Sequence, residues 1–249
     1  MDRILKELPL SFIVHHPVSK VDVEPFVELT RKVVLAIKLA KVPYFIKIGG
    51  TGSLYVPSYK GGHVTACDYP EFWRAYRHQI ADSEAHTVYM EERLAPIGAG
   101  LRKLRHARAA RREGRATQED LDFIADYEKK VMAQDDSLTF VRAGRTTFMF
   151  FDGNTSFKWS YASPPPMYRP GRRTGEYRVV QDVLPLDPPD TDPSDLEGHL
   201  LGITVADMAV AIADDAESQE NAYKHWTAVG SLMPDTPAPS YITLDSCTQ

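Results

Sequence analysis

The chain has 249 residues, of which 43% are hydrophobic, 25% charged and 10% aromatic. This composition is close to the average of soluble globular domains and excludes disordered, collagen-like and disulfide-scaffold proteins. The net charge of −5 gives no overall attraction to nucleic acid or to an anionic membrane. The two cysteines, Cys67 and Cys247, have no zinc-binding spacing and fit a reducing compartment. We therefore expect a cytoplasmic protein that binds a small-molecule substrate, with no nucleic acid and no membrane as partners.

The first elements predicted along the chain form a strand–helix–strand unit. Residues 11–16 are a short apolar run of β type, which a proline ends. A helix is expected over 24–41, because apolar residues recur there at helical spacing. The strand 44–48 follows and runs directly into the glycine-rich turn 49–54. This order, with short connections, is typical of a parallel sheet.

The middle of the chain predicts an inserted helical segment, about 77–136. A helical region over 71–94 is followed by a basic helix over 99–113 and by an acidic helix that Thr117 and Asp120 open with the spacing of a capping box. We interpret the basic and acidic helices as a surface hairpin of opposite charges. The alternative is a nucleic-acid site on the basic helix, but the acidic helix would cancel much of its field.

The remaining predicted elements are a helix over 137–151, strands over 157–163 and 177–186, a helix that begins after Thr204, and a last strand over 225–230. The fold class is therefore α/β: a Rossmann-like parallel sheet with flanking helices, abbreviated at its N-terminus and carrying the inserted helical hairpin. We expect one domain over 1–230 and a flexible tail over 231–249.

Four segments carry a family resemblance: YFIKIGGTGSL, DYPEFWRAYR, FKWSYASPPPMYRPGRRTGEYRV and GITVADMAVAIADDAE, in that order. Together they resemble the second half of atypical short-chain dehydrogenase/reductases, the NmrA-like or NAD(P)H-binding Rossmann proteins. The resemblance covers residues from about 12 to 230, apart from the insertion. It implies a Rossmann-like fold, NADP(H) as the cofactor, and an oxidoreductase that acts on a small organic carbonyl or enone.

Two family features do not occur in this sequence. The glycine-rich strand–turn–helix that holds the cofactor pyrophosphate is not found, since the chain begins near the position of the family's fourth strand. The reductases' Tyr-x-x-x-Lys motif is not found either, and Tyr89 with Arg93 is the nearest approximation. A cofactor-independent isomerase, dehydratase or cyclase on the same fold, a non-catalytic NmrA-like sensor or binding protein, and a remnant of a longer gene product therefore remain as alternatives. Exposed sheet edges would favour a homo-oligomer.

The candidate catalytic residues are Thr51, Ser53 and Tyr76. In an open α/β sheet the ligand lies beyond the carboxyl ends of the strands, where the hydroxyls of Thr51 and Ser53 could hydrogen-bond a carbonyl oxygen. Tyr76 lies where the family often carries an aromatic residue, and its phenol is a candidate proton donor. The alternative for Tyr76 is a packed, half-buried tyrosine.

The candidate cofactor-binding residues are His15, Gly49, Gly50 and Ser163. The glycines would let a ligand approach the backbone closely, although a tight turn without a ligand explains them too. His15 ends the first strand and could exchange protons near neutral pH, or it could be structural. Ser163 should form one wall of the cleft. No metal site is expected, because the histidines and carboxylates lack ligand spacing.

Overall fold

The structure is a computed structural model that describes residues 23–93, 98, 100–133 and 139–232. The described helices and strands are α1 (Val23–Leu39), β1 (Phe45–Ile48), α2 (Pro70–Asp82), α3 (Glu84–Arg93), α4 (Leu101–Arg112), α5 (Gln118–Met132), α6 (Thr139–Thr147), β2 (Trp159–Ala162), β3 (Met167–Arg169), β4 (Tyr177–Gln181), β5 (Gly202–Thr204), α7 (Val205–Ser218) and β6 (His225–Gly230). Three short 3₁₀ helices are η2 (Thr51–Ser53), η3 (Ala66–Asp68) and η5 (Phe148–Phe150). None of these helices is long and apolar enough to cross a membrane.

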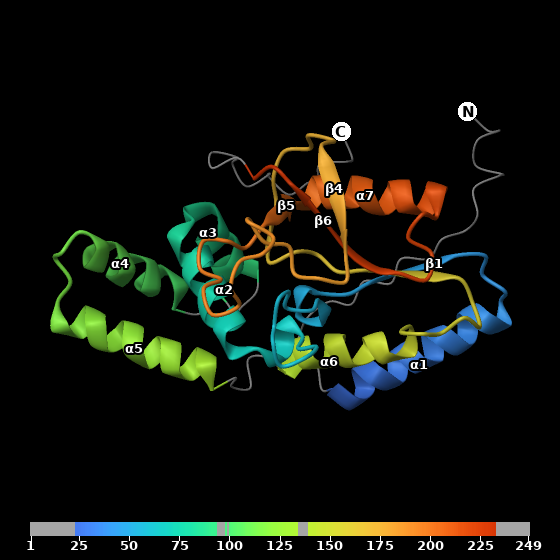
Figure 1. Cartoon of the computed structure of the whole chain (residues 1–249), viewed down its shortest axis with the longest axis horizontal. Coiled ribbons are helices and arrows are strands. Elements are labelled where there is room, and N and C mark those ends of the chain that lie inside the picture. The colour runs from blue at the N-terminus through green and yellow to red at the C-terminus, as the bar shows by residue number, and fades with distance from the viewer. Residues whose placement is uncertain (1–22, 94–97, 99, 134–138, 233–249) are drawn as a thin grey trace, which may run out of the picture.

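A four-stranded sheet with the order β1-β2-β6-β4 forms the centre of the fold. Strands β1, β2 and β6 are parallel, and β4 pairs antiparallel with β6. Helix α7 covers one face of this sheet, and α1 and α6 cover the other (Figure 1). A second, two-stranded parallel sheet joins β3 to β5. This arrangement confirms the expected α/β class, a Rossmann-like, parallel-rich sheet with flanking helices.

The alternation of side chains along β1 explains why helices cover both faces of the sheet. Phe45 packs with α1 and with the rings of Phe151 and Trp159, whereas Ile46 packs with α7 and with Trp226. Successive strand residues point to opposite faces, so a strand with large apolar side chains on both faces must be covered twice. Each such side chain contributes about 1.5–3 kcal/mol when it is removed from water.

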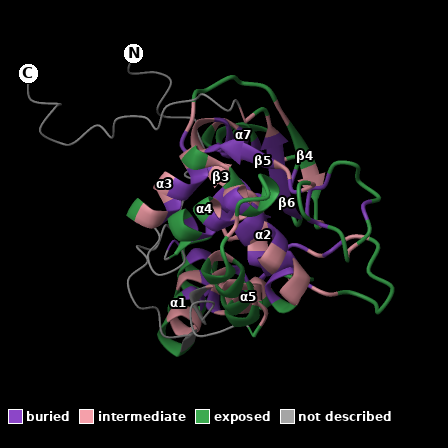
Figure 2. Ribbon diagram, turned by 90° about the vertical axis from the view of Figure 1, so that its left-hand side faces the viewer, coloured by how far each residue is buried: buried purple, intermediate pink, exposed green. Residues whose placement is uncertain are grey.

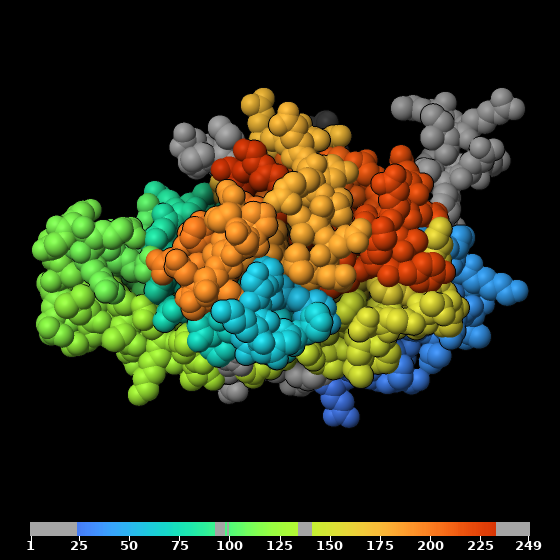
Figure 3. Space-filling model, in the orientation of Figure 1, coloured from blue at the N-terminus to red at the C-terminus, as the bar shows by residue number. Residues whose placement is uncertain are grey.

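In a third core, α2, α4 and α5 pack together with residues of the turn after β1, of β3 and of the segment 184–200. Helix α4 buries the apolar face formed by Leu101, Leu104, Ala107 and Ala110, whose spacing is that of an amphipathic helix. The hairpin of α4 and α5 protrudes at one end of the molecule (Figure 3). Seen from that end, the outer sides of these helices are exposed, and buried residues concentrate on the strands and inner helix faces (Figure 2). The predicted hairpin is therefore present.

The charges of α4 pair mainly with residues outside the hairpin. Arg102 and Arg105 pair with acidic residues of α3, and Arg108 and Arg112 both pair with Asp82 of α2. In the part of the chain that the structure describes, one ion pair, between Lys103 and Glu119, joins α4 to α5. Helix α4 thus pairs mainly with α2 and α3, against which it also packs.

Several boundaries also differ from the prediction. The helical region 71–94, for which a broken and a continuous helix were both open, is broken at Ser83, whose backbone is extended. The strand expected to reach residue 186 ends at Gln181, because the next residue, Asp182, has a left-handed φ of 60°. Residues 167–169 form a strand, β3, outside the predicted elements. The predicted strand 11–16, which contains His15, lies outside the described residues, as do residues 233–249 of the predicted tail.

Candidate functional site

Two serines and a histidine meet at the carboxyl ends of β1 and β2. Ser53 lies in the turn after β1, Ser163 directly follows β2, and His225 begins β6 beside Tyr161. The two hydroxyl oxygens are 2.8 Å apart, and the Nε2 atom of His225 lies 3.1 Å from Ser53 Oγ and 2.9 Å from Ser163 Oγ. All three side chains are buried. We call Ser53, Ser163 and His225 the hydroxyl–imidazole cluster.

Local packing fixes the turn that presents Ser53. The amide of Gly49 donates to the carbonyl of Ala162 and so extends the β1–β2 pairing by one residue. A Cβ atom at Gly49 would lie 2.0 Å from Cε1 of Tyr161, so only glycine fits there. The hydroxyl of Thr51 donates to the carbonyl of Pro164 at 2.7 Å and joins the turns that follow the two strands.

His225 is held among aromatic rings at the inner side of the cluster. Its ring lies 4.5 Å from the ring of Phe148 and 5.3 Å from that of Tyr161, measured between centroids. Burial lowers the pKa of His225 to about 4, because an imidazolium would lose its hydration there. His225 is therefore a neutral imidazole near pH 7 and can accept a proton from a hydroxyl.

Helix α6 and η5 close the cluster on one side, and the glycine turn borders open space on another. Val141 of α6 fills the space beside Gly52, where a Cβ atom would lie 2.5 Å from its Cγ1. By contrast, a Cβ atom at Gly50 would meet no atom within 4 Å, and Gly50 is partly exposed. The glycine turn thus borders open space at Gly50, whereas the hydroxyls of Ser53 and Ser163 are buried.

The structure brings some of the predicted site residues together and leaves others apart. Ser53 and Ser163 contact each other, and Thr51, Gly49 and Gly50 form the adjoining turn. Tyr76 instead lies in the core that contains α2, α4 and α5. Its ring stacks on that of Phe72, with 5.6 Å between centroids, and meets that of Trp73 edge-on, with 5.7 Å between centroids. Burial raises the pKa of Tyr76 to about 12, which fits a packed tyrosine.

The sequence reasoning did not identify His225 or its neighbour Asp182. The Oδ1 atom of Asp182 lies 3.6 Å from the Nδ1 atom of His225. A histidine at the first position of the predicted strand 225–230 was a usable signal. Its place beside the serines depends, however, on β6 lying next to β2, which no local pattern specifies.

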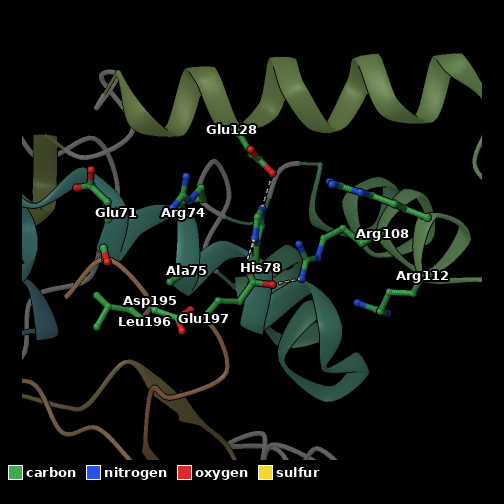
Figure 4. Close-up of a pocket in the computed structure, with 12 residues that line it drawn as sticks. Glu71, Arg74, Ala75, His78, Arg108, Arg112, Glu128, Asp195, Leu196 and Glu197 are labelled. Carbon is green, nitrogen blue, oxygen red and sulfur yellow. Dashed lines mark hydrogen bonds and ion pairs between the residues drawn. The ribbon is translucent and has the colours of Figure 1, made fainter. Parts of the chain in front are cut away.

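A separate groove of about 570 Å³ lies between α2, α4, α5 and the segment 194–197. Four arginines and four carboxylates line this groove, so it has no marked excess of either charge. At its centre, His78 contacts Glu128 of α5 and Glu197, and Glu197 also binds Arg108 (Figure 4). These bonds, first that from His78 and then that from Arg108, lower the pKa of Glu197 to about 2. The groove residues thus mainly hold α4 and α5 against α2 and the segment 194–197.

Comparisons with known proteins add only weak likenesses. No family model and no curated protein matches the sequence. Among solved structures, the chain is similar to one provisionally named an exported protein from Burkholderia pseudomallei (16% identity, 88% of this chain and 71% of that one, TM-score 0.49). It is also similar to one provisionally named an NADH-flavin reductase from Streptococcus pneumoniae (12%, 91% and 74%, TM-score 0.49). A third is provisionally named an epimerase, from Bacteroides thetaiotaomicron (15%, 90% and 87%, TM-score 0.46). Likenesses this low assign neither a family nor a function.

Proposed function

We propose that this chain is an NAD(P)-dependent oxidoreductase-like protein that acts on a small organic carbonyl or enone. The observation that carries the proposal is the hydroxyl–imidazole cluster at the carboxyl ends of two parallel strands, the edge where ligands bind in open α/β sheets. The four-segment resemblance in the sequence agrees with it. The cluster would handle the proton of the reaction.

In this proposal a serine hydroxyl binds the carbonyl oxygen of the substrate. The oxygen of the same hydroxyl remains in contact with Nε2 of His225, at a distance of 2.9 Å for Ser163. In the oxidation direction the substrate hydroxyl gives its proton to the serine oxygen while the serine proton passes to Nε2 of His225. In the reduction direction the imidazolium returns that proton through the serine to the substrate oxygen. Burial removes competing water from these groups.

The described residues fit a nicotinamide cofactor at its reacting end and not at its phosphates. A pyrophosphate is usually bound where a strand turns into the amino terminus of a helix. In the described part of the chain, the junction of β5 and α7 has this form, but Thr204 caps the helix and the carboxylate of Asp207 ties the segment 174–175 to it. Asp207 accepts hydrogen bonds from the amides of Thr174 and Gly175 and from the hydroxyl of Thr204. A bound nicotinamide would supply the hydride, and the phosphates have no cradle among these residues.

This mismatch favours a second candidate, a cofactor-independent isomerase on the same cluster. A neutral, buried imidazole that contacts two hydroxyls can act as a general base without any cofactor. The substrate class would again be an enone or a similar carbonyl compound, since abstraction of a proton beside a carbonyl is the reaction that such a base performs.

One set of measurements tests both candidates. We would titrate the purified full chain with NADPH and with NADH, following fluorescence and heat, and then assay a panel of carbonyls and enones with and without cofactor. Micromolar binding and cofactor-dependent turnover support the first candidate. Turnover or solvent-deuterium exchange without cofactor supports the second. If saturating cofactor gives no signal, the oxidoreductase proposal is lost.

Variants connect any activity to the cluster. Replacing both Ser53 and Ser163 by alanine should lower kcat by about 100-fold or more, whereas the exposed Ser218→Ala should not. Gly50→Val should block the approach to the cluster and leave the fold intact, because its extended backbone (φ −153°) accepts a side chain and the space beside it is open. Gly144→Ala, also in open space, is the matched control. Full activity in Gly50→Val would contradict the proposed approach.

A further inference from the structure

His225 has one ring nitrogen whose role the hydroxyl–imidazole cluster does not explain. Its Nε2 atom contacts the serines, whereas its Nδ1 atom is buried and has no hydrogen-bond partner in the described part of the chain. The nearest charged group to Nδ1 is the carboxylate of Asp182, at 3.6 Å. Buried polar atoms normally have partners, so an orphaned nitrogen that faces a carboxylate calls for an explanation.

The backbone holds Asp182 in place beside this nitrogen. Its amide donates to the carbonyl of His225 at 3.0 Å, and its carbonyl accepts from the amide of Tyr55 at 2.8 Å. Its φ of 60° is a left-handed conformation, in which aspartate and asparagine are tolerated far better than most residues. Asp182 therefore directly follows β4, and these two hydrogen bonds hold its backbone beside His225, the first residue of β6.

The inventory of protons indicates which tautomer this arrangement selects. A neutral imidazole carries a single N–H. If the proton is on Nδ1, it points toward the carboxylate of Asp182, and Nε2 is free to accept from the hydroxyl of Ser163. If the proton is on Nε2, the lone pair of Nδ1 faces a carboxylate. The first arrangement is attractive and the second repulsive.

We infer that Asp182 is a positioning residue that holds His225 in the Nδ1–H tautomer and thereby makes Nε2 the proton acceptor for Ser163. The catalytic meaning of this role rests on the proposed function, but the tautomer itself does not. Besides burial, the carboxylate of Asp152 acts on Asp182, and both carboxylates and the guanidinium of Arg145 act on the phenol of Tyr55. Asp182 is also 57% exposed at its side chain, so it connects the buried imidazole with solvent.

The direct test is the protonation of the two ring nitrogens in the full chain, measured by nitrogen-15 NMR near pH 7. In the wild type, Nδ1 of His225 should give the signal of a protonated nitrogen and Nε2 that of an unprotonated one. In Asp182→Asn, which keeps a residue that tolerates the left-handed backbone, the amide can donate to Nδ1 and the population should move toward Nε2–H. Asp152→Asn, which removes a nearby charge that does not face the ring, should leave the tautomer unchanged.

Two results would overturn the inference. One is an Nε2–H tautomer in the wild type, a measurement that does not depend on whether any variant folds. The other is an unchanged tautomer in a folded Asp182→Asn protein. If turnover is found, kcat of Asp182→Asn should fall by about 100-fold with KM nearly unchanged, and the substitution should have little further effect in a Ser163→Ala background. If the protein is inactive and has the Nδ1–H tautomer, the proposed function is contradicted and this inference is supported. If the protein is active and has the Nε2–H tautomer, the proposed function is supported and this inference is contradicted.

Discussion

Replacing His225 with glutamine should remove a pH-dependent loss of stability from the protein. Burial lowers the pKa of His225 in the folded chain to about 4, from an ordinary value of 6.5. Between these pH values the unfolded chain binds one more proton at this residue than the folded chain does. Stability is therefore complete above pH 6.5 and is lost as the pH falls toward 4. His225 is 2% exposed, so little solvent screening reduces the effect.

The size of the effect follows from the two pKa values. Going from about pH 7 to about pH 5, the proton-linked cost of folding at His225 grows by about 2 kcal/mol. His86, whose pKa burial lowers to about 3, adds a similar dependence that the variant retains. The informative quantity is consequently the stability difference between wild type and His225→Gln, and not the pH dependence of either alone.

Urea unfolding at both pH values measures this difference. The glutamine amide can still reach the serine hydroxyls, but it cannot be protonated in this range. Whatever the substitution costs near pH 7, the wild-type advantage should shrink by about 2 kcal/mol near pH 5. His106→Gln, at an exposed position of α4, controls for loss of a histidine. A wild-type advantage that stays the same at both pH values would refute the burial argument for His225.

Three substitutions test the packing that supports the site and its surroundings, each by urea or thermal unfolding. Gly49→Ala should destabilise the fold by about 1–3 kcal/mol, because its Cβ atom would lie 2.0 Å from the ring of Tyr161. Gly50→Ala, whose Cβ atom meets no other atom, should reduce stability far less. Equal losses of stability would contradict this account of the packing. Asp207→Ala should lower the stability by about 3 kcal/mol, because it leaves the amides of Thr174 and Gly175 without their acceptor. A loss of stability no larger than that of the exposed Glu217→Ala would show that these hydrogen bonds do not stabilise the fold. Thr117→Ala should cost about 1 kcal/mol through loss of the capping box of α5, and an unchanged midpoint would argue against it.

The elements with strong local patterns were predictable from the sequence. The periodic apolar residues of α1, α4 and α7 and the apolar strands β1, β2 and β6 are found close to their predicted ranges. The capping box at Thr117 is also confirmed. These features depend on neighbours within a few residues, so the sequence itself contains the relevant information.

Features that depend on distant residues were not predictable. Strands β3 and β5 have three residues each and pair across more than 30 positions, so neither shows a strand pattern of its own. Ser53 and His225 are 172 residues apart and meet only because β6 lies beside β2. Ser53 and Ser163 were better placed for prediction, since both follow apolar strands of a parallel sheet and parallel strands end at one edge.

The glycine turn after β1 contains two kinds of glycine, and this distinction sharpens the functional proposal. From the sequence alone, close approach of a ligand to the backbone would explain all three glycines, Gly49, Gly50 and Gly52. In the fold, however, the spaces beside Gly49 and Gly52 are filled by Tyr161 and Val141, so the chain's own packing requires these two. Gly50 alone of the three has open space and an extended backbone that any residue could adopt. Packing therefore gives no reason for a glycine at position 50, and a ligand that passes there on its way to the hydroxyls would supply one.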